Sequence, residues 1–348
     1  MIVPFVVFLF ISCCNTTQEI SYDSSEIDSS SIINVEIDTV PLTQQLVNPR
    51  RIEQLNDSLL VIFDPDGGDN SCMLLNSDGF VYDTFGRRGK AKNELISPIS
   101  MTVCGNKVIV YDYSTQKAVS YYPLKNVHKV NGTAEENYYS IFPNSEDNDG
   151  AAINSFIGVN DGRLFIFGNN KHWISMLKDG NVISKYMDYP IIDSDEECNW
   201  SLWGQFAEYA ISPNNKHLIV GTRIGAVMEL FHINDKSIEP HKVKGFYRPD
   251  FNIAIGAIPK CVTSTDKTIE GFCSICALDD YFLAVIGGKE CMKRNEVIIF
   301  DYEGKVLGKR LLPGDVSCMA VINNSLYMII DFLDGKTKLC KADITCFE

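Results

Sequence analysis

Histidine and tryptophan are scarce in this chain of 348 residues, which contains five of the first and three of the second. No two histidines are three or four residues apart, so the HExxH pattern of helical zinc sites is absent. The GxSxG motif of serine hydrolases is absent as well. The one CxxC pair, Cys273 and Cys276, lacks the second pair that a four-ligand zinc site requires. The sequence therefore predicts no metal site, no cofactor and no catalytic residue.

Positive charge is also in short supply. Lysine and arginine together number 31 against 45 acidic residues, which gives a net charge of −14. Such a surface repels phosphate backbones, so nucleic acid is excluded as a partner. The hydrophobic fraction of 45% is ample for a folded core, and the charged fraction of 22% is ordinary.

The apolar run at the N-terminus, Ile2–Ile11, is too short to cross a hydrocarbon layer of about 30 Å, but its length suits a signal peptide. It ends in Phe10-Ile11-Ser12-Cys13, which resembles a bacterial lipobox with a small residue before the modified cysteine. We therefore expect a signal peptide over residues 1–12 and a lipid on Cys13. The alternatives are a signal without lipid, or a short anchor cut by a misplaced start codon.

The next segment is rich in serine, threonine and acidic residues and holds few apolar ones. It cannot bury enough surface to offset its ordering entropy. We predict a flexible tether over residues 13–30 and a folded body over residues 31–348.

The body repeats a pattern of a polar turn pair followed by a β-rich run, six times at intervals of roughly 45 to 65 residues. Asn, Asp and Gly in the turns tolerate the positive φ that tight hairpins need. The six pairs are Asn56-Asp57, Gly105-Asn106, Asp161-Gly162, Asn214-Asn215, Asp279-Asp280 and Asn323-Asn324. Several units show a second turn and further strands, which gives about four strands per unit. This periodicity predicts an all-β fold, a six-bladed β-propeller of four-stranded antiparallel blades.

The last unit is one strand short of a full blade. The N-terminal segment Ser31–Val40 alternates apolar residues as a strand does. We expect it to pair beside Leu339–Ile344 as the outer strand of the last blade, which would close the ring and hide an open edge.

The stretch FGRRGKAKNELISP, Phe85–Pro98, could be a phosphate-binding loop or a junction between blades. Its glycines are separated by two residues, whereas a P-loop has four and a Ser or Thr after the lysine. The stretch resembles the blade junction of NHL-like propellers, and most closely that of the TolB-like six-bladed lipoproteins of Bacteroidetes. Four positions match: Gly86, Gly89, Glu94 and Pro98. Residues 91–93 stand where that family has Gly-Pro-Gly, and Leu95 replaces an aromatic residue.

Apart from Cys13 and Cys14, the chain has ten cysteines, which are scattered through strand-like runs, and this favours free buried thiols over a disulfide framework. Two acidic loops, Asp64–Asn70 and Ser145–Gly150, are alternatives for a bound cation, but neither follows the EF-hand order. Solvated acidic turns are the simpler interpretation of both.

Two long connections, Tyr186–Tyr209 and Gly245–Phe272, are the best candidates for binding loops. Their aromatic and arginine side chains could form a ligand-binding patch or could pack between blades. The candidate residues are Trp200, Trp203, Phe206, Tyr247 and Arg248.

These features together predict a non-catalytic binding or scaffold propeller, exported and lipid-anchored in the cell envelope. Its partner would be an envelope protein or an extracellular glycan. The alternative is an enzyme, a hydrolase or lyase acting on saccharides or lactones at the central channel. Convergent His, Arg, Tyr and carboxylate groups with shifted pKa values at the channel mouth would favour the enzyme, and apolar packing with scattered polar groups would favour the scaffold.

Overall fold

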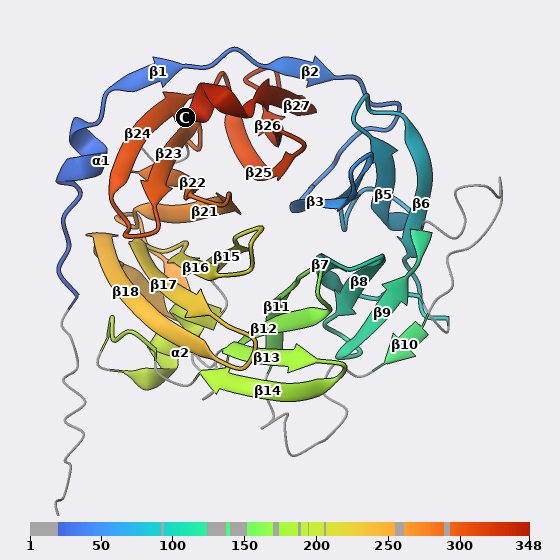
Figure 1. Ribbon diagram of the computed structural model, residues 1–348, viewed down its shortest axis with the longest axis horizontal. Coiled ribbons are helices and arrows are strands. Elements are labelled where there is room, and N and C mark those ends of the chain that lie inside the picture. The colour runs from blue at the N-terminus through green and yellow to red at the C-terminus, as the bar shows by residue number, and fades with distance from the viewer. Residues whose placement is uncertain are drawn as a thin grey trace, which may run out of the picture.

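A computed structural model describes residues 20–91, 94–123, 137–139, 152–169, 174–186, 189–193, 195–204, 207–254, 261–288 and 293–348. Within this part of the chain, six sheets stand in a ring around a central axis (Figure 1). The innermost strand of each sheet comes first in the chain, and the following strands pair outward. The expected all-β, six-bladed propeller is confirmed.

Blades 1 to 3 each have four antiparallel strands. Blade 1 holds β3 (Arg51–Asn56), β4 (Leu59–Phe63), β5 (Asn70–Asn76) and β6 (Val81–Arg87). Blade 2 holds β7 (Pro98–Cys104), β8 (Lys107–Asp112), β9 (Lys117–Tyr121) and β10 (Asn137–Tyr139). Blade 3 holds β11 (Ala152–Gly158), β12 (Arg163–Asn169), β13 (Ile174–Lys178) and β14 (Asn181–Tyr186).

Blades 4 to 6 continue the ring. Blade 4 holds β15 (Ala207–Ile211), β16 (His217–Thr222), β17 (Ala226–Ile233) and β18 (Ile238–Tyr247). Blade 5 holds β21 (Glu270–Ala277), β22 (Tyr281–Gly288), β23 (Glu296–Asp301) and β24 (Val306–Leu311). Blade 6 holds β25 (Asp315–Ile322), β26 (Ser325–Asp331) and β27 (Thr337–Asp343), and a 3-10 turn over Ile344–Phe347 follows. The connections carry α2 (Glu196–Gly204) and a ribbon of β19 (Phe251–Ile253) with β20 (Val262–Ser264).

The six turn pairs found in the sequence fall between the first and second strands of the six blades. Asn323 and Asn324 have φ of 47° and 61°, and Gly105 has φ of 62°. Asparagine and glycine adopt this left-handed backbone at low cost, which explains their recurrence at these positions.

The hydrophobic core lies between neighbouring blades, because each blade is covered on both faces. One cluster joins Val61 and Leu74 of blade 1 to Val108 and Val119 of blade 2. This two-sided burial explains why the second strands are apolar throughout, as in β4, where all five residues are buried.

The N-terminal segment closes the ring and crosses from blade 5 to blade 6. β2 (Asp38–Val40) pairs antiparallel with β27, with Val40 opposite Leu339, so the expected closing strand is confirmed. The first part of the same segment pairs with blade 5, which the sequence did not predict. β1 (Ile32–Asn34) pairs parallel with β24 and gives blade 5 a fifth, outermost strand.

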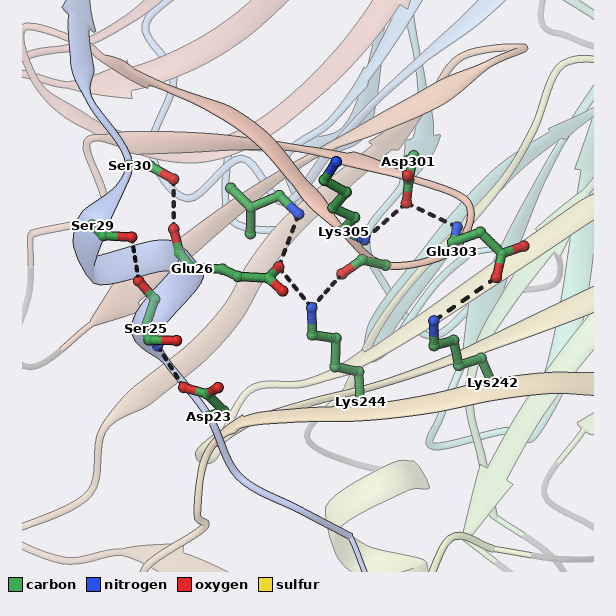
Figure 2. A network of polar contacts seen from close by, with 12 residues as sticks. Asp23, Ser25, Glu26, Ser29, Ser30, Lys242, Lys244, Asp301, Glu303 and Lys305 are labelled. Atoms are coloured by element: carbon green, nitrogen blue, oxygen red, sulfur yellow. Dashed lines mark hydrogen bonds and ion pairs between the residues drawn. The ribbon is translucent and has the colours of Figure 1, made fainter.

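Residues from Ile20 onward, part of the stretch that we assigned to the tether, pack against the propeller. Tyr22 bridges Gly245 of β18, and a short helix, α1 (Ser25–Ser29), follows it. The carboxylate of Glu26 on α1 accepts a hydrogen bond of 2.8 Å from Lys244 of blade 4 and one of 3.2 Å from the backbone of Val306 in blade 5 (Figure 2). We call residues 22–40 the strap.

Residues 1–19, including the signal peptide and Cys13, lie outside the described residues, so those predictions stay predictions. Among the residues that the structure describes, no helix is long and apolar enough to cross a membrane.

The stretch Phe85–Pro98 is the junction between β6 and β7, as its spacing predicts. Gly86 has φ of 76°, and Leu95 is fully buried. A Cβ at Gly89 would lie 1.9 Å from the Glu94 carboxylate, which explains why a glycine and a glutamate occur together here.

Candidate functional site

The central channel opens into a cavity of about 400 Å³ at the end where the six innermost strands begin. Its wall is unusually polar for the interior of a propeller. Its charged and amide-bearing lining residues include Arg50, Arg51, Asn154, Glu208, Arg223 and Arg294. We call this cavity the channel mouth.

One-residue bulges place side chains in the channel mouth. In β11, Ile153 pairs with Gly168 and Ser155 with Phe167, which leaves Asn154 without a partner in the ladder. Ile99, Cys273 and Ser317 are skipped in the same way in β7, β21 and β25. All four skipped residues line the channel mouth. Bulges re-aim side chains next to functional sites, and here the same device recurs in four blades.

Arginine is concentrated at the mouth. The chain has nine arginines and 22 lysines, and four of the arginines line this cavity while none of the described lysines does. In a chain of net charge −14, such a collection of one cation type is a local reversal of the overall charge.

Carboxylates from the surrounding strands orient these arginines. Arg294 binds Glu270 with two nitrogens, Nη2 at 2.6 Å and Nε at 3.0 Å. Arg51 forms an ion pair with Glu53, whose other oxygen accepts a hydrogen bond from the backbone of Val103 in blade 2. Neither Glu270 nor Glu53 lines the mouth, so the two arginines are supported from behind.

Arg223 is held differently, because its backbone rather than its side chain is fixed. Its carbonyl accepts a hydrogen bond of 2.8 Å from Gly271 of blade 5. Its guanidinium lies 3.7 Å from the Glu208 carboxylate, and the Arg223 side chain remains 40% exposed. Of Arg51, Arg223 and Arg294, Arg223 is therefore the one whose guanidinium group is most available to a ligand.

Glu208 is the ionisable acid of the mouth. Burial raises the pKa of its carboxyl, and the nearby guanidinium groups of Arg223, Arg51 and Arg294 offset only part of that rise. The neighbouring Tyr209 donates a hydrogen bond of 2.8 Å to the Trp203 carbonyl, and burial raises the pKa of its hydroxyl as well.

Asn154 adds a polar atom that nothing in the described part of the chain satisfies. Its amide nitrogen Nδ2 is buried and has no hydrogen-bond partner there. A buried donor without an acceptor costs about 1–3 kcal/mol, so its retention at a cavity wall is consistent with a ligand acceptor.

The opposite end of the channel is different in character. A cavity of about 220 Å³ lies there, and Arg51 and Tyr209 line it as well as the mouth. Its remaining wall mixes apolar residues such as Ile52, Val103 and Met319 with the polar side chains of Glu53, Gln54 and Asn160. Arg50, Arg223 and Arg294 line the mouth and not this cavity, so the arginines gather at one end of the channel.

The candidate residues in the two long connections are not gathered in one exposed patch. Trp203 on α2 is fully buried and donates a hydrogen bond of 3.1 Å to the Pro190 carbonyl, and Trp200 on the same helix is half-buried. Tyr247 is buried at the end of β18, where its hydroxyl lies 3.0 Å from Asp28 of α1. Arg248 is exposed, and Phe206 lies outside the described residues. Ligand binding by these residues stays a prediction.

The first acidic loop has a structural role. Asp64 is buried, and its two carboxylate oxygens accept hydrogen bonds from the backbone of Val47 at 2.7 Å and of Asn48 at 3.0 Å. The second acidic loop lies outside the described residues. Among those described, no group of three or more His, Cys, Asp or Glu side chains converges as a metal site.

Most of the folded body, residues 38–324, matches the family model of TolB-like six-bladed propellers. The chain belongs to this family. The resemblance that the junction suggested is thereby confirmed. No curated protein matches the chain.

Solved structures show the same fold at low sequence identity. A Bacteroides fragilis protein described as exported is 12% identical, with a TM-score of 0.59 over 90% of this chain and 96% of that one. Regucalcin from Agrobacterium tumefaciens, described as calcium-binding, is 10% identical, with a TM-score of 0.53 over 90% and 95%. A luciferin-regenerating enzyme is 10% identical, with a TM-score of 0.52 over 88% and 95%. At these identities the likeness concerns the fold alone.

Proposed function

We propose that this chain is an exported, lipid-anchored binding propeller whose ligand site is the channel mouth. The observation that carries the proposal is the set of four arginines and one raised-pKa glutamate around a cavity of about 400 Å³. A channel that served only as a scaffold would be filled by apolar packing. Pockets of this size accept small molecules or the terminal units of larger ones.

An extracellular glycan fits this site better than a folded envelope protein does. The cavity is concave and narrow, whereas protein interfaces bury about 800 Å² on each partner. A chain end of a glycan can enter such a cavity and leave the remainder outside. The protein partner remains the alternative.

Blocking the mouth tests the proposal. Ser317→Trp places an indole in the mouth, and Leu333→Trp adds the same group at a fully exposed turn of blade 6. On a glycan array, the wild type and Leu333→Trp should give the same signals, and Ser317→Trp should lose them. A melting temperature within a few degrees of the wild type would show that Ser317→Trp is folded. Signals that survive in this folded variant would refute a site at the mouth.

The lipid anchor has its own test. Cells that express the chain are fed a fatty-acid analogue, and Cys13→Ala should abolish the label while Cys14→Ala should leave it. A structural relative carries a description as an exported protein, but the anchor rests on the lipobox resemblance of residues 10–13. A label that persists in Cys13→Ala would refute it.

The second candidate function is an enzyme at the same site, acting on saccharides or lactones as a hydrolase or lyase. Glu208 favours it, because a carboxyl with a raised pKa beside guanidinium groups can hold a proton for transfer. Product release from acidic saccharides or lactones that stops in Glu208→Gln would establish it. Binding without turnover in the wild type would leave the binding propeller as the function.

A further inference from the structure

The arginines of the channel mouth select for one chemical class of ligand. We propose that the mouth binds a small oxyanion, a carboxylate or phosphate group carried on a sugar-sized molecule. The inference rests on the proposed function, since it names what that site holds.

Charge alone does not explain the composition of the mouth, because lysine is more than twice as abundant in the chain and lines it nowhere among the described residues. Arginine differs from lysine in its planar group of five N–H donors, which matches the two oxygens of a carboxylate or phosphate. The selection of arginine therefore indicates geometric recognition of an oxyanion.

The supporting carboxylates leave donors free for this task. The Glu270 carboxylate accepts hydrogen bonds from Nη2 and Nε of Arg294. Among the described residues of the mouth wall, none is a hydrogen-bond partner of the third nitrogen of Arg294, Nη1. Arg223 forms one ion pair at 3.7 Å, too long for a direct hydrogen bond, so its donors can turn to a ligand. Glu53 and Glu270 pre-orient their arginines, which lowers the entropy lost on binding.

The neutral groups of the mouth suit the rest of such a ligand. Asn154 offers a buried N–H donor, and the hydroxyls of Ser100 and Ser155 lie 3.4 Å apart at the same wall. Hydroxyl and amide groups bind the hydroxyls of a sugar, while the arginines bind its charged substituent. The volume of about 400 Å³ admits one or two sugar rings.

The test uses three probes that share one ring: glucuronate, glucose 6-phosphate and glucose. Each is titrated into the purified full-length chain by isothermal titration calorimetry at low salt. We expect one or both charged probes to bind, and glucose to bind at least tenfold more weakly. Binding should weaken as the ionic strength rises. The ratio between glucuronate and glucose 6-phosphate tells a carboxylate site from a phosphate site.

Variants locate the site and separate shape from charge. Arg223→Gln should weaken the charged probe about tenfold or more. Arg223→Lys keeps the charge but loses the planar group, and it should also weaken binding. Arg87→Gln is the matched control, because Arg87 lies on the outermost strand of blade 1 with a side chain that is 74% exposed. Arg248→Gln examines the exposed arginine of the long connection in the same assay.

Two outcomes would overturn the inference. One is that neither charged probe binds more tightly than glucose. The other is that Arg223→Gln binds as the wild type does, or loses no more than Arg87→Gln. If neutral glycans bind the array and Ser317→Trp abolishes that signal, the mouth remains the ligand site and only the oxyanion is wrong. If Ser317→Trp changes nothing, the site itself is wrong.

Discussion

Glu208 is the residue at which acidity controls the charge of the channel mouth. Its pKa is raised, chiefly by burial, so it gains a proton at a higher pH than an ordinary glutamate does. Once it is protonated, Arg223 loses the carboxylate at 3.7 Å that competes with an incoming anion. Arg51 and Arg294, the other charged groups that face Glu208, keep their charge throughout.

The affinity for a charged probe should therefore rise as the pH falls through the raised pKa of Glu208. Glu208→Gln should bind tightly at every pH and lose this dependence. Titrations of glucuronate between about pH 8 and about pH 5 measure the effect, because its carboxylate stays ionised over this range, whereas a phosphate monoester changes its own charge at about pH 6. A wild-type affinity that is flat in pH, or a variant that keeps the slope, would contradict the role given to Glu208.

Gly271 supports the mouth through its lack of a side chain. A Cβ at this position would lie 1.5 Å from the Gly225 carbonyl oxygen and 2.3 Å from that of Thr222, and both are backbone atoms. The close approach lets the Gly271 amide bind the carbonyl of Arg223. Gly271 thus sets the position of Arg223 without touching the cavity.

Gly271→Ala should lower the free energy of unfolding by about 3 kcal/mol, because the backbone of blade 4 must move away from β21. Urea denaturation checks this. Gly335→Ala is a useful comparison, because the space around that glycine is open and only its φ of 77° is strained. Equal losses in the two variants would mean that backbone conformation, and not the close approach, explains the effect.

Some residues of the fold could be predicted from the sequence, and the site could not. Gly86 and Leu95 belong to one short stretch of sequence, Phe85–Pro98, whose glycine spacing and resemblance to a blade junction identified its role. Arg51, Arg223 and Arg294 come from three different blades, and no local pattern connects them. Their meeting depends on the ring, and the signal in the sequence was only that arginine is rarer than lysine.

At the scale of elements, the bulges of the inner strands and the first part of the strap, residues 22–30, were both invisible to periodicity. A bulge shifts one residue out of a ladder, which alternation over five or six residues does not reveal. The strap is rich in polar residues, and such composition correctly indicates that it cannot fold alone. It is ordered because β18 and β24 offer backbone and side-chain partners.

The ion pair of Glu26 with Lys244 contributes modestly to docking of the strap. The Glu26 side chain is 46% exposed, so Glu26→Gln should lower the free energy of unfolding of the protein by less than about 1 kcal/mol at neutral pH. The hydrogen bond from Lys244 lowers the pKa of Glu26, so its contribution is present above the ordinary pKa of 4.5. It disappears as the pH falls through the lowered value.

The melting temperatures of the wild type and Glu26→Gln should therefore differ at pH 7 and become equal in acid. A gap that widens in acid would contradict the assigned direction. Ser30→Ala is a suitable comparison, because it removes a hydrogen bond within α1 and leaves the link to Lys244 in place (Figure 2).

For the molecule as a whole, stability depends on joining the two ends of the chain. The apolar rhythm of the six units and the incomplete last blade were enough to predict this closure, because an unpaired edge must be covered. The division of one N-terminal segment between two blades was not predictable. Ile32–Asn34 pairs through its backbone, and the side chains of Ile32 and Ile33 remain about half exposed.

Removal of residues 1–40 should abolish cooperative folding or produce aggregates, because β27 would then present a bare edge. Removal of residues 1–30 keeps β1 and β2, and that shorter chain should still fold in one transition. Size-exclusion chromatography and thermal unfolding compare the two. A monomeric, cooperative fold without β2 would show that the ring does not need its closing strand.

The path of the N-terminal segment also limits how far the propeller would lie from a membrane. The segment reaches the body at the outer rim of blade 4, where Ile20 and Tyr22 pack, far from the axis (Figure 1). With the lipid on Cys13, the intervening chain reaches at most about 30 Å even when fully extended. The outer rim of blade 4 would then stay within about that distance of the bilayer surface.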